Sequence, residues 1–324
     1  MKLFNELESI LNIKDVFLIN EKQKKKIHKN FFNVLTKYHY KNCKEYRNIL
    51  NILKFDIKKE YDLDQLPFLP VTLFKNLDLI TTKKNNITKT MNSSGTTSKK
   101  LSKIFLDKEN TKNQIKALSS LFSTMAGTKK RLPMLIIDTK AVLKNRKIFS
   151  ARVAAINGFS IFGTNHQYIL NSKGEINKNK LRAFLKKYSN KRFFVFGFTS
   201  FVYKCFFELI KNNKYDFSGA ILLHGGGWKK MESKKINNKL FKKNLIKRFN
   251  FKEVINYYGM VEQTGSIFLE CKHCSNFVTS NYSDVLIRDR NFNIIENDRK
   301  GLIQLFSLLP TSYPGHSILT EDIG

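Results

Sequence analysis

Hydrophobic and polar positions alternate along the chain with a spacing that changes from one region to the next. In residues 1–65 apolar side chains recur every three or four positions, as in Leu3, Leu7 and Ile10, which predicts amphipathic helices. The two prolines of residues 66–70 end any helix, because a proline restrains its own backbone and that of the residue before it. The N-terminal region is therefore expected to be helical up to about residue 65.

Short apolar runs follow, separated by amphipathic stretches. Four of them are candidate buried strands: Leu132–Asp138, Arg192–Gly197, Gly219–His224 and Val254–Tyr258. Thr199 or Ser200 is a candidate cap for a helix over 201–210, and a basic helix is expected after Gly227. Strand, glycine turn and helix in this order predict an α/β fold, with a mostly parallel sheet and helices on its faces.

The last region has the pattern of strands alone. Residues 284–287 and 302–306 are apolar and flank a polar turn, which predicts a small antiparallel β region. We therefore expect three parts: a helical region over 1–65, an α/β core over 66–283 and an antiparallel β subdomain over 284–324.

Composition excludes several protein classes. The chain has 324 residues, of which 42% are hydrophobic, so it can bury a core and is not disordered. Four cysteines are too few for a disulfide scaffold, which makes a reducing cytoplasm the expected location. The apolar run 193–203 is too short to cross a bilayer, and the N-terminus lacks the layout of a signal peptide.

The formal net charge of +32 raises the question of nucleic-acid binding. Lysine is spread along most of the chain beside asparagine, whereas residues 280–324 hold four basic and six acidic residues. This placement favours general solvation over a nucleic-acid surface, and no nucleic-acid-binding motif is present.

Four glycine-containing or hydroxyl-rich turns are candidates for chemistry. Residues 91–103 combine hydroxyls, Gly95 and lysines that could donate to phosphate oxygens. They lack a Walker loop, and taken alone such a stretch is more often an ordinary solvated loop. His224 and three glycines follow a strand at the edge where parallel sheets bind ligands. The residue type alone favours a structural role for His224, and leaves Trp228 open between packing and the pocket.

The other two turns add an aromatic ring and carboxylates. Tyr258 precedes Gly259 and could stack on a base, while Glu262, four residues later, could reach a magnesium ion that bridges phosphates. Near the end of the sequence, Asp322 could accept both hydroxyls of a ribose.

Together these turns resemble the adenylate-forming superfamily, and within it the acyl-protein synthetases of luminescence operons (LuxE type), relatives of phenylacetate–CoA ligase. The resemblance covers residues 60–324. The strings that carry it are Leu66–Lys75 (LPFLPVTLFK), Ser93–Thr97 (SSGTT), His224–Lys229 (HGGGWK), Tyr258–Ser266 (YGMVEQTGS) and Pro310–Asp322 (PTSYPGHSILTED).

The resemblance implies a large N-terminal domain of an adenylate-forming enzyme that uses ATP and Mg²⁺. Such an enzyme activates a carboxylic acid, here expected to be a fatty acid, to an acyl-adenylate and passes the acyl group to a protein or carrier thiol. The implied catalytic residues are Ser94, Thr96, Thr97, Lys103 and Glu262, with Glu262 as the metal ligand. The implied nucleotide-binding residues are Ser93, Gly95, His224, Gly225, Gly226, Gly227, Tyr258, Gly259 and Asp322.

Two residues and one missing region depart from the superfamily pattern. Ser98 stands where a second glycine is usual, and Val261 where most members have a hydroxyl residue. No counterpart of the C-terminal lid, with its catalytic lysine and acyl-accepting cysteine, follows Asp322. Because a lid excludes water from the mixed anhydride, slow catalysis is expected. The alternative hypothesis is a catalytically impaired fragment, or a nucleotide- or nucleic-acid-binding protein that retains the fold.

Cys271 and Cys274 form a C-x-x-C pair around His273. The pair could be half of a zinc site, but Cys43 and Cys205 are isolated and supply no second pair. Structural thiols are the favoured interpretation, and an acyl-accepting thiolate is a further hypothesis.

Overall fold

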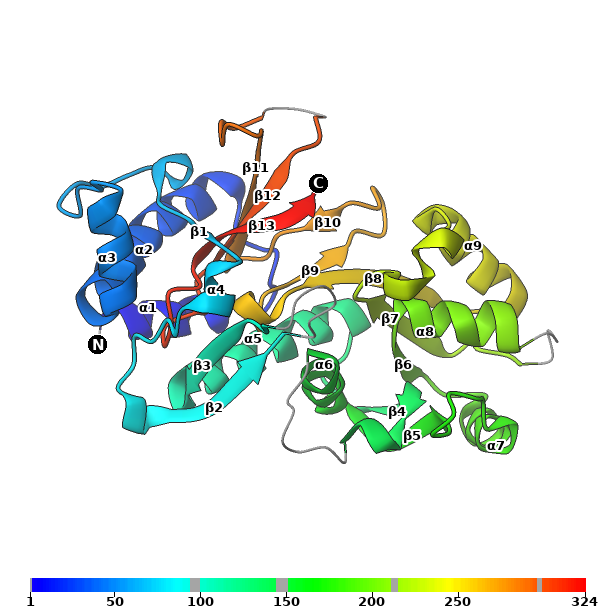
Figure 1. Cartoon of the computed structure of the whole chain (residues 1–324). Helices are drawn as coiled ribbons and strands as arrows, with labels where there is room; N and C mark the ends of the chain where they lie inside the picture. The colour runs from blue at the N-terminus through cyan, green and yellow to red at the C-terminus, as the bar shows by residue number, and fades with distance from the viewer. Residues whose placement is uncertain (1, 94–99, 144–150, 211–214, 296–298) are drawn as a thin grey trace. The chain divides into compact units, whose positions relative to one another are not determined.

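The computed structural model describes residues 2–93, 100–143, 151–210, 215–295 and 299–324 (Figure 1). They form two compact units. Unit 1 comprises Met1–Thr124, Gly259–Ile267 and Thr279–Gly324, and unit 2 comprises Met125–Tyr258 and Phe268–Val278. The fold is mixed α/β, as predicted. The division into regions 1–65, 66–283 and 284–324 stays a prediction.

Unit 1 begins with helices, as the apolar spacing predicts. They are α1 (Lys2–Leu11), α2 (Glu21–Asn42), α3 (Lys44–Ile52) and the 3-10 turn η1 (Leu63–Gln65). Helix α2 starts where the Asn20 side chain accepts a hydrogen bond from the backbone N–H of Gln23 at 2.9 Å, which satisfies one of the free donors of its first turn.

The described residues of unit 1 include a four-stranded sheet of order β1-β13-β12-β11. Its strands are β1 (Leu69–Pro70), β11 (Ser283–Arg288), β12 (Leu302–Ser307) and β13 (Ser317–Ile323). Strands β11, β12 and β13 pair antiparallel, which confirms the predicted antiparallel region. Strand β1 pairs parallel with β13, so the proline segment that ends the helices also adds an edge strand.

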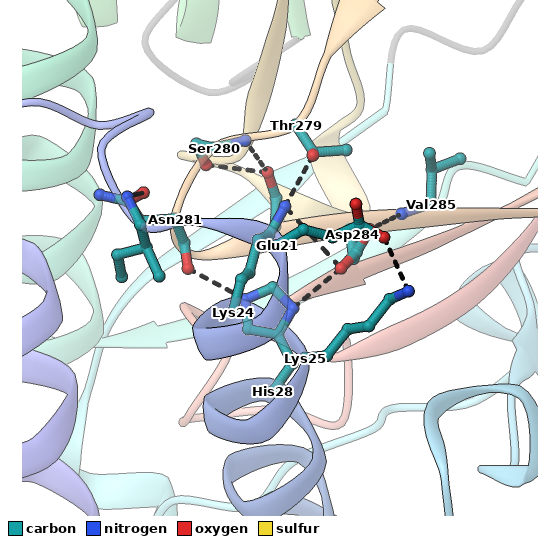
Figure 2. Close-up of polar contacts among 11 residues, drawn as sticks. Glu21, Lys24, Lys25, His28, Thr279, Ser280, Asn281, Asp284 and Val285 are labelled. Carbon is teal, nitrogen blue, oxygen red and sulfur yellow. Dashed lines mark hydrogen bonds and ion pairs between the residues drawn. The ribbon is translucent and has the colours of Figure 1, made fainter.

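Polar contacts join α2 to β11 (Figure 2). His28 is 1% exposed, and its Nδ1 lies 3.0 Å from Asp284 Oδ2 while its Nε2 lies 2.9 Å from the carbonyl oxygen of Asn281. Both contacts are to oxygen atoms, so the ring is held on both sides by residues 281–284. Lys24 lies one turn earlier and donates to Thr279 Oγ1 at 2.6 Å. The first half of α2 is thereby fixed to the sheet.

Further elements of unit 1 flank the predicted phosphate loop in the sequence. Helix α4 (Leu73–Asn76) and the 3-10 turn η2 (Lys84–Asn86) precede a two-stranded ribbon of β2 (Ile87–Asn92) and β3 (Lys103–Asp107), and α5 (Lys108–Ala126) follows it. Ser94, Gly95, Thr96 and Thr97, four of the predicted loop residues, lie outside the described residues.

Unit 2 is organised around a sheet that, in the described part of the chain, has seven strands in the order β10-β9-β8-β7-β6-β4-β5. Their bounds are β4 (Leu132–Thr139), β5 (Gly163–Leu170), β6 (Phe193–Phe198), β7 (Ala220–Gly225), β8 (Glu253–Gly259), β9 (Ile267–Glu270) and β10 (Phe277–Val278). Strands β4 to β8 pair parallel and β9 pairs antiparallel with β10. All four predicted strands are present.

Helices cover both faces of this sheet, as predicted (Figure 1). They are α6 (Ala151–Ser160), α7 (Lys178–Tyr188), α8 (Thr199–Tyr203) and α9 (Asn238–Phe249), with 3-10 turns η3 (Lys140–Leu143) and η5 (Lys229–Lys234). Side chains of α7, α8 and α9 pack into one core with Val195 and Leu222 of the sheet. On the opposite face Phe159 of α6 contacts the rings of Phe196 and Tyr257.

Two local predictions in unit 2 are wrong. Helix α8 starts at Thr199 without a side-chain cap and continues as the π-helical turn η4 (Lys204–Leu209). Thr199 does not cap it because its hydroxyl bonds to β7 residues instead. The basic helix after Gly227 is broken, since η5 and a short link precede α9.

None of the helices in the described part of the chain combines the length and the apolar character that spanning a bilayer requires.

Candidate functional site

Glu262 is the most buried carboxylate among the predicted site residues. It belongs to the 3-10 turn η6 (Val261–Gln263) of unit 1, and its side chain is 5% exposed. Burial raises the pKa of Glu262, while the nearby Ser102 hydroxyl and the charge of Lys75 lower it and the charge of Asp322 raises it further. Ser102, Lys75 and Asp322 are therefore near enough to Glu262 to influence its ionisation.

Neighbouring side chains hold η6 against the last strands of unit 1. Gln263 is fully buried, and its Nε2 donates to the carbonyl oxygens of Leu305 at 3.1 Å and Gly315 at 2.9 Å. A Cβ on Gly315 would lie 2.8 Å from the carbonyl oxygen of Glu262, so only glycine allows this approach. The two most specific sequence strings, 258–266 and 310–322, therefore pack against each other through Glu262 and Gln263.

The ends of β2 and β3 bring two serines together beside this carboxylate. The backbone N–H of Ser93 donates to the carbonyl oxygen of Ser102 at 3.0 Å, and the N–H of Ser102 donates to Ser93 Oγ at 3.0 Å. Ser93 was predicted, whereas Ser102 and Lys75 were missed. Lys103 Nζ lies 3.8 Å from the exposed carboxylate of Asp78, and its predicted role stays a prediction.

Asp322 lies on the exposed end of β13. Its backbone N–H donates to Thr320 Oγ1 at 3.2 Å, and the Thr320 hydroxyl donates to the carbonyl oxygen of Ile303 at 2.8 Å. The adjacent Glu321 carboxylate lies 3.9 Å from Lys75 Nζ. Unit 1 thus brings together Ser93, Glu262 and Asp322 of the predicted set. The group formed by Glu262, Ser102, Lys75 and Asp322 is called the acidic centre below.

In unit 2 the predicted glycines follow β7 at the carboxyl edge of the parallel strands. Gly226 and Gly227 have φ of +77° and +69°, a backbone region that glycine adopts without steric cost. A Cβ on Gly226 would lie 2.4 Å from the Phe198 ring, whereas one on Gly227 would meet nothing within 4 Å. Gly227 therefore presents open backbone, as a ligand-binding turn requires.

His224 occupies the strand just before these glycines and is 1% exposed. The Thr199 hydroxyl lies 3.0 Å from His224 Nδ1 and donates to the carbonyl oxygen of Gly225 at 3.1 Å. Because the Thr199 hydroxyl donates its proton to Gly225, it can only accept from His224. Nδ1 therefore carries the ring proton and donates to Thr199 Oγ1. Burial, with a contribution from Lys242, lowers the pKa of His224 to about 3, so the ring is neutral and connects the ends of β6 and β7.

Tyr258 and Gly259 end β8. The Tyr258 ring is half-buried and lies 6.2 Å from the rings of Phe268 and Phe277 on the neighbouring strands. A Cβ on Gly259 would lie 2.8 Å from the Ile267 side chain, so this glycine serves a close backbone approach. Trp228 packs edge-on to Tyr203 and Phe241, which supports the packing interpretation.

The ion pair between Asp138 and Arg152 lies at the same sheet edge, and the sequence pattern did not predict it. Asp138 ends β4 and is 1% exposed. It accepts hydrogen bonds from Arg152 of α6, one of them from Nε at 2.7 Å. Arg152 also lies 4.4 Å from the centre of the Phe201 ring. The pair fixes α6 to the sheet.

Magnesium usually takes one or two protein carboxylates and completes its shell with water and phosphate oxygens. Glu262 fits this role, because a nearby positive charge stabilises the ionised form of its buried carboxylate. Among the described residues no group of three or more His, Cys, Asp or Glu side chains could hold a metal alone. A metal at Glu262 would therefore depend on oxygens from a bound nucleotide.

Comparison with known proteins gives three findings. The family model "Acyl-protein synthetase, LuxE" matches residues 4–324. The long-chain-fatty-acid–luciferin-component ligase of Photorhabdus luminescens is 29% identical over 92 residues, which are 28% of this chain and 78% of that protein.

The third finding is structural. A 2-hydroxyisobutyryl-CoA ligase in the postadenylation state matches with a TM-score of 0.68 and 11% identity. The match covers 96% of this chain and 64% of that ligase, so the chain spans somewhat less than two thirds of it. At this identity the likeness shows a shared fold.

Proposed function

The chain belongs to the LuxE acyl-protein synthetase family, and from this membership we propose that it activates a carboxylic acid with ATP and passes the acyl group to a thiol. The observation that carries the proposal is the acidic centre of unit 1. Glu262 is 5% exposed, and burying a carboxylate costs free energy. Its pKa is perturbed by a hydroxyl, a lysine and a second carboxylate, as is typical of functional sites.

The proposed first step is the attack of the substrate carboxylate on the α-phosphorus of ATP. An oxygen–phosphorus bond forms, the bond to the β-phosphate breaks, and pyrophosphate leaves. Catalysis of such a step is mainly positioning and charge neutralisation. Magnesium, when bound, would neutralise phosphate charge, and Glu262 is the residue that would hold it. Lys75 adds a positive charge near Glu262, while Asp322 would accept the ribose hydroxyls.

We assign the predicted phosphate contacts to Ser93 and to the 94–97 segment, with Lys103 as a further cation. In unit 2, Gly225, Gly226 and Gly227 would border the adenine and Tyr258 would stack on it, since base–aromatic stacking tolerates any base. His224 would act indirectly, because it is buried and fixes the Gly225 carbonyl through Thr199. Gly259 would allow the chain to turn after Tyr258.

For the substrate we propose a long-chain fatty acid. The support is the similarity to the Photorhabdus ligase, whose name gives this acid. A cytoplasmic location is proposed on the same family basis. The acceptor would be a thiol of a protein or carrier, because the family is one of acyl-protein synthetases.

A second candidate is a nucleotide-binding protein without turnover. Its support is the shared fold, which at 11% identity shows no particular reaction. Exchange of labelled pyrophosphate into ATP distinguishes the two. Exchange that one acid of a fatty-acid panel stimulates supports the enzyme, whereas ATP binding without exchange supports the second candidate.

The acidic centre is tested in the same assay with Glu262→Gln. We expect acid-dependent exchange to fall by about 100-fold, the usual cost of losing one group that stabilises transition-state charge. Glu232→Gln is the matched control, because Glu232 is exposed and pairs with Lys235 on the surface. Equal exchange by both variants would contradict the role of Glu262.

A further inference from the structure

Cys271 and Cys274 occupy the turn between β9 and β10 in unit 2. The turn is tight: the N–H of Cys271 donates to the carbonyl oxygen of Asn276 at 2.8 Å, and the N–H of Ser275 donates to the carbonyl oxygen of Cys271 at 3.1 Å. Ser275 has a φ of +61°, the left-handed conformation that reverses the chain. This geometry holds both cysteines within one closed turn.

The turn presents hydrogen-bond donors to the Cys271 sulfur. The backbone N–H of His273 lies 3.4 Å from it, and both the N–H and the thiol of Cys274 are within interaction distance. Donors of this kind stabilise the thiolate, so they lower the pKa of Cys271. The Cys274 thiol is therefore near enough to favour ionisation of Cys271.

Exposure separates this pair from the other cysteines. Cys271 is half-buried and Cys274 is exposed, whereas Cys43 and Cys205 are buried. Burial raises the pKa of both Cys43 and Cys205, which keeps them as thiols. The structural-thiol interpretation therefore suits Cys43 and Cys205 but not the C-x-x-C pair. In the described chain no third ligand joins the pair, which favours redox chemistry over a metal.

We propose that Cys271 and Cys274 form a reversible dithiol–disulfide site that reacts with low-molecular-weight disulfides such as glutathione disulfide. The Cys271 thiolate attacks one sulfur of the disulfide, and one glutathione thiolate leaves. Cys274 then loses its proton and attacks the Cys271 sulfur, which releases the second glutathione. The chain loses two hydrogen atoms, and one glutathione disulfide becomes two thiols.

The site is connected to a residue of the proposed nucleotide site. Phe277 begins β10, pairs with Glu270 across the hairpin, and lies 6.2 Å from the Tyr258 ring. Closing a disulfide in the connecting turn changes the hairpin on which Phe277 is held. Oxidation is therefore expected to weaken nucleotide stacking on Tyr258, and this part rests on the proposed function.

The experiment treats the full chain with glutathione disulfide and follows intact mass and peptide maps. The expected product has lost two hydrogen atoms, contains the Cys271–Cys274 disulfide, and returns to the dithiol with a reductant. Cys274→Ser should instead accumulate one glutathione on Cys271. Cys271→Ser should react about tenfold more slowly. A wild-type chain that stays unchanged, or that forms a stable mixed disulfide as Cys274→Ser does, overturns the site.

ATP affinity of the reduced and oxidised chain tests the connection to Tyr258. We expect oxidation to weaken binding about fivefold, on the scale of one stacking interaction, and the double variant Cys271→Ser/Cys274→Ser to show no change. Equal affinities overturn the connection. If the reduced chain does not bind ATP, the proposed function and the connection fail together, while the mass measurement still decides the redox site.

Discussion

Two stacked histidines inside unit 1 show how single residues fix the 310–316 turn. His39 and His316 have ring centroids 4.8 Å apart. His39 Nε2 lies 3.1 Å from the carbonyl oxygen of Pro310, and His316 Nε2 lies 3.0 Å from Thr36 Oγ1. Gly315 of this turn approaches the carbonyl oxygen of Glu262. The two histidines therefore help to position the acidic centre. Neither histidine could be assigned this role from its position in the sequence.

Their burial makes stability depend on pH. Burial lowers the pKa of His316 to about 3, and burial together with His316 lowers that of His39 well below 6.5. The unfolded chain therefore binds more protons below pH 6.5, so the stabilisation is complete above that pH and is lost as the pH falls. We expect each histidine to cost about 1.4 kcal/mol per pH unit well below pH 6.5.

Denaturant unfolding between pH 7.5 and 5 measures this slope. His316→Gln should be less stable than the wild type at neutral pH but should lose stability less steeply on acidification. His166→Gln, at an exposed position, is the control and should keep the wild-type slope. A His316→Gln slope equal to that of the wild type would contradict the prediction.

At the scale of elements, the predictability of a strand follows its burial. Strands β6 and β7 are buried at every position and appear in the sequence as continuous apolar runs. Strand β5 lies at the sheet edge and contains Thr164, Asn165 and His166, so no apolar run marks it. The cap predicted for α8 failed for a different reason, because the Thr199 hydroxyl takes a tertiary partner that the sequence does not reveal.

The contact between α2 and β11 gives a prediction at this scale (Figure 2). Burial would raise the pKa of Asp284, but the hydrogen bond from His28 and the charges of Lys24 and His28 hold it below its usual value. Asp284→Asn removes the carboxylate that contacts His28 Nδ1 at 3.0 Å and leaves Lys24, whose Nζ lies 3.8 Å away, without its counter-charge. We expect unfolding free energy to fall by about 2 kcal/mol, measured at pH 7.

Lys25 and Glu21 supply the control for Asp284→Asn. They form an exposed pair on the same helix at 2.7 Å, and exposed pairs contribute little. Glu21→Gln should therefore leave the free energy of unfolding close to that of the wild type. Similar losses in the two variants would mean that the contact with β11 does not stabilise the helix.

At the scale of the molecule, the sequence predicts which residues belong to the site better than it predicts which other residues lie near them in space. Glu262 and Asp322 were predicted from short strings. Ser102 and Lys75, which influence the same carboxylate, lie in the candidate segments 91–103 and 66–75, but nothing in the sequence assigned them to Glu262. Their proximity arises from the path of the chain through β1, β3 and β13. Local spacing cannot encode such contacts between residues far apart in sequence.

Ligand-induced stabilisation tests the whole arrangement. If ATP binds only the native chain, a concentration of 100 times the dissociation constant should add about 2.7 kcal/mol to the unfolding free energy. Asp322→Asn should lose most of this gain at the same concentration, because the ribose hydroxyls lose their acceptor. Asp64→Asn, at another exposed carboxylate, should keep it. An undiminished gain in Asp322→Asn would exclude the ribose assignment.

The place of β13 between β1 and β12 has a consequence for biosynthesis. Leu69 and Pro70 pair with Ile318 and Leu319. Strand β1 therefore cannot pair with β13 until about 250 further residues have been translated. Unit 2 is drawn from one interval of the sequence, 125–278 apart from a short excursion. Its sheet can be completed during translation, whereas unit 1 can close only after its last strand emerges.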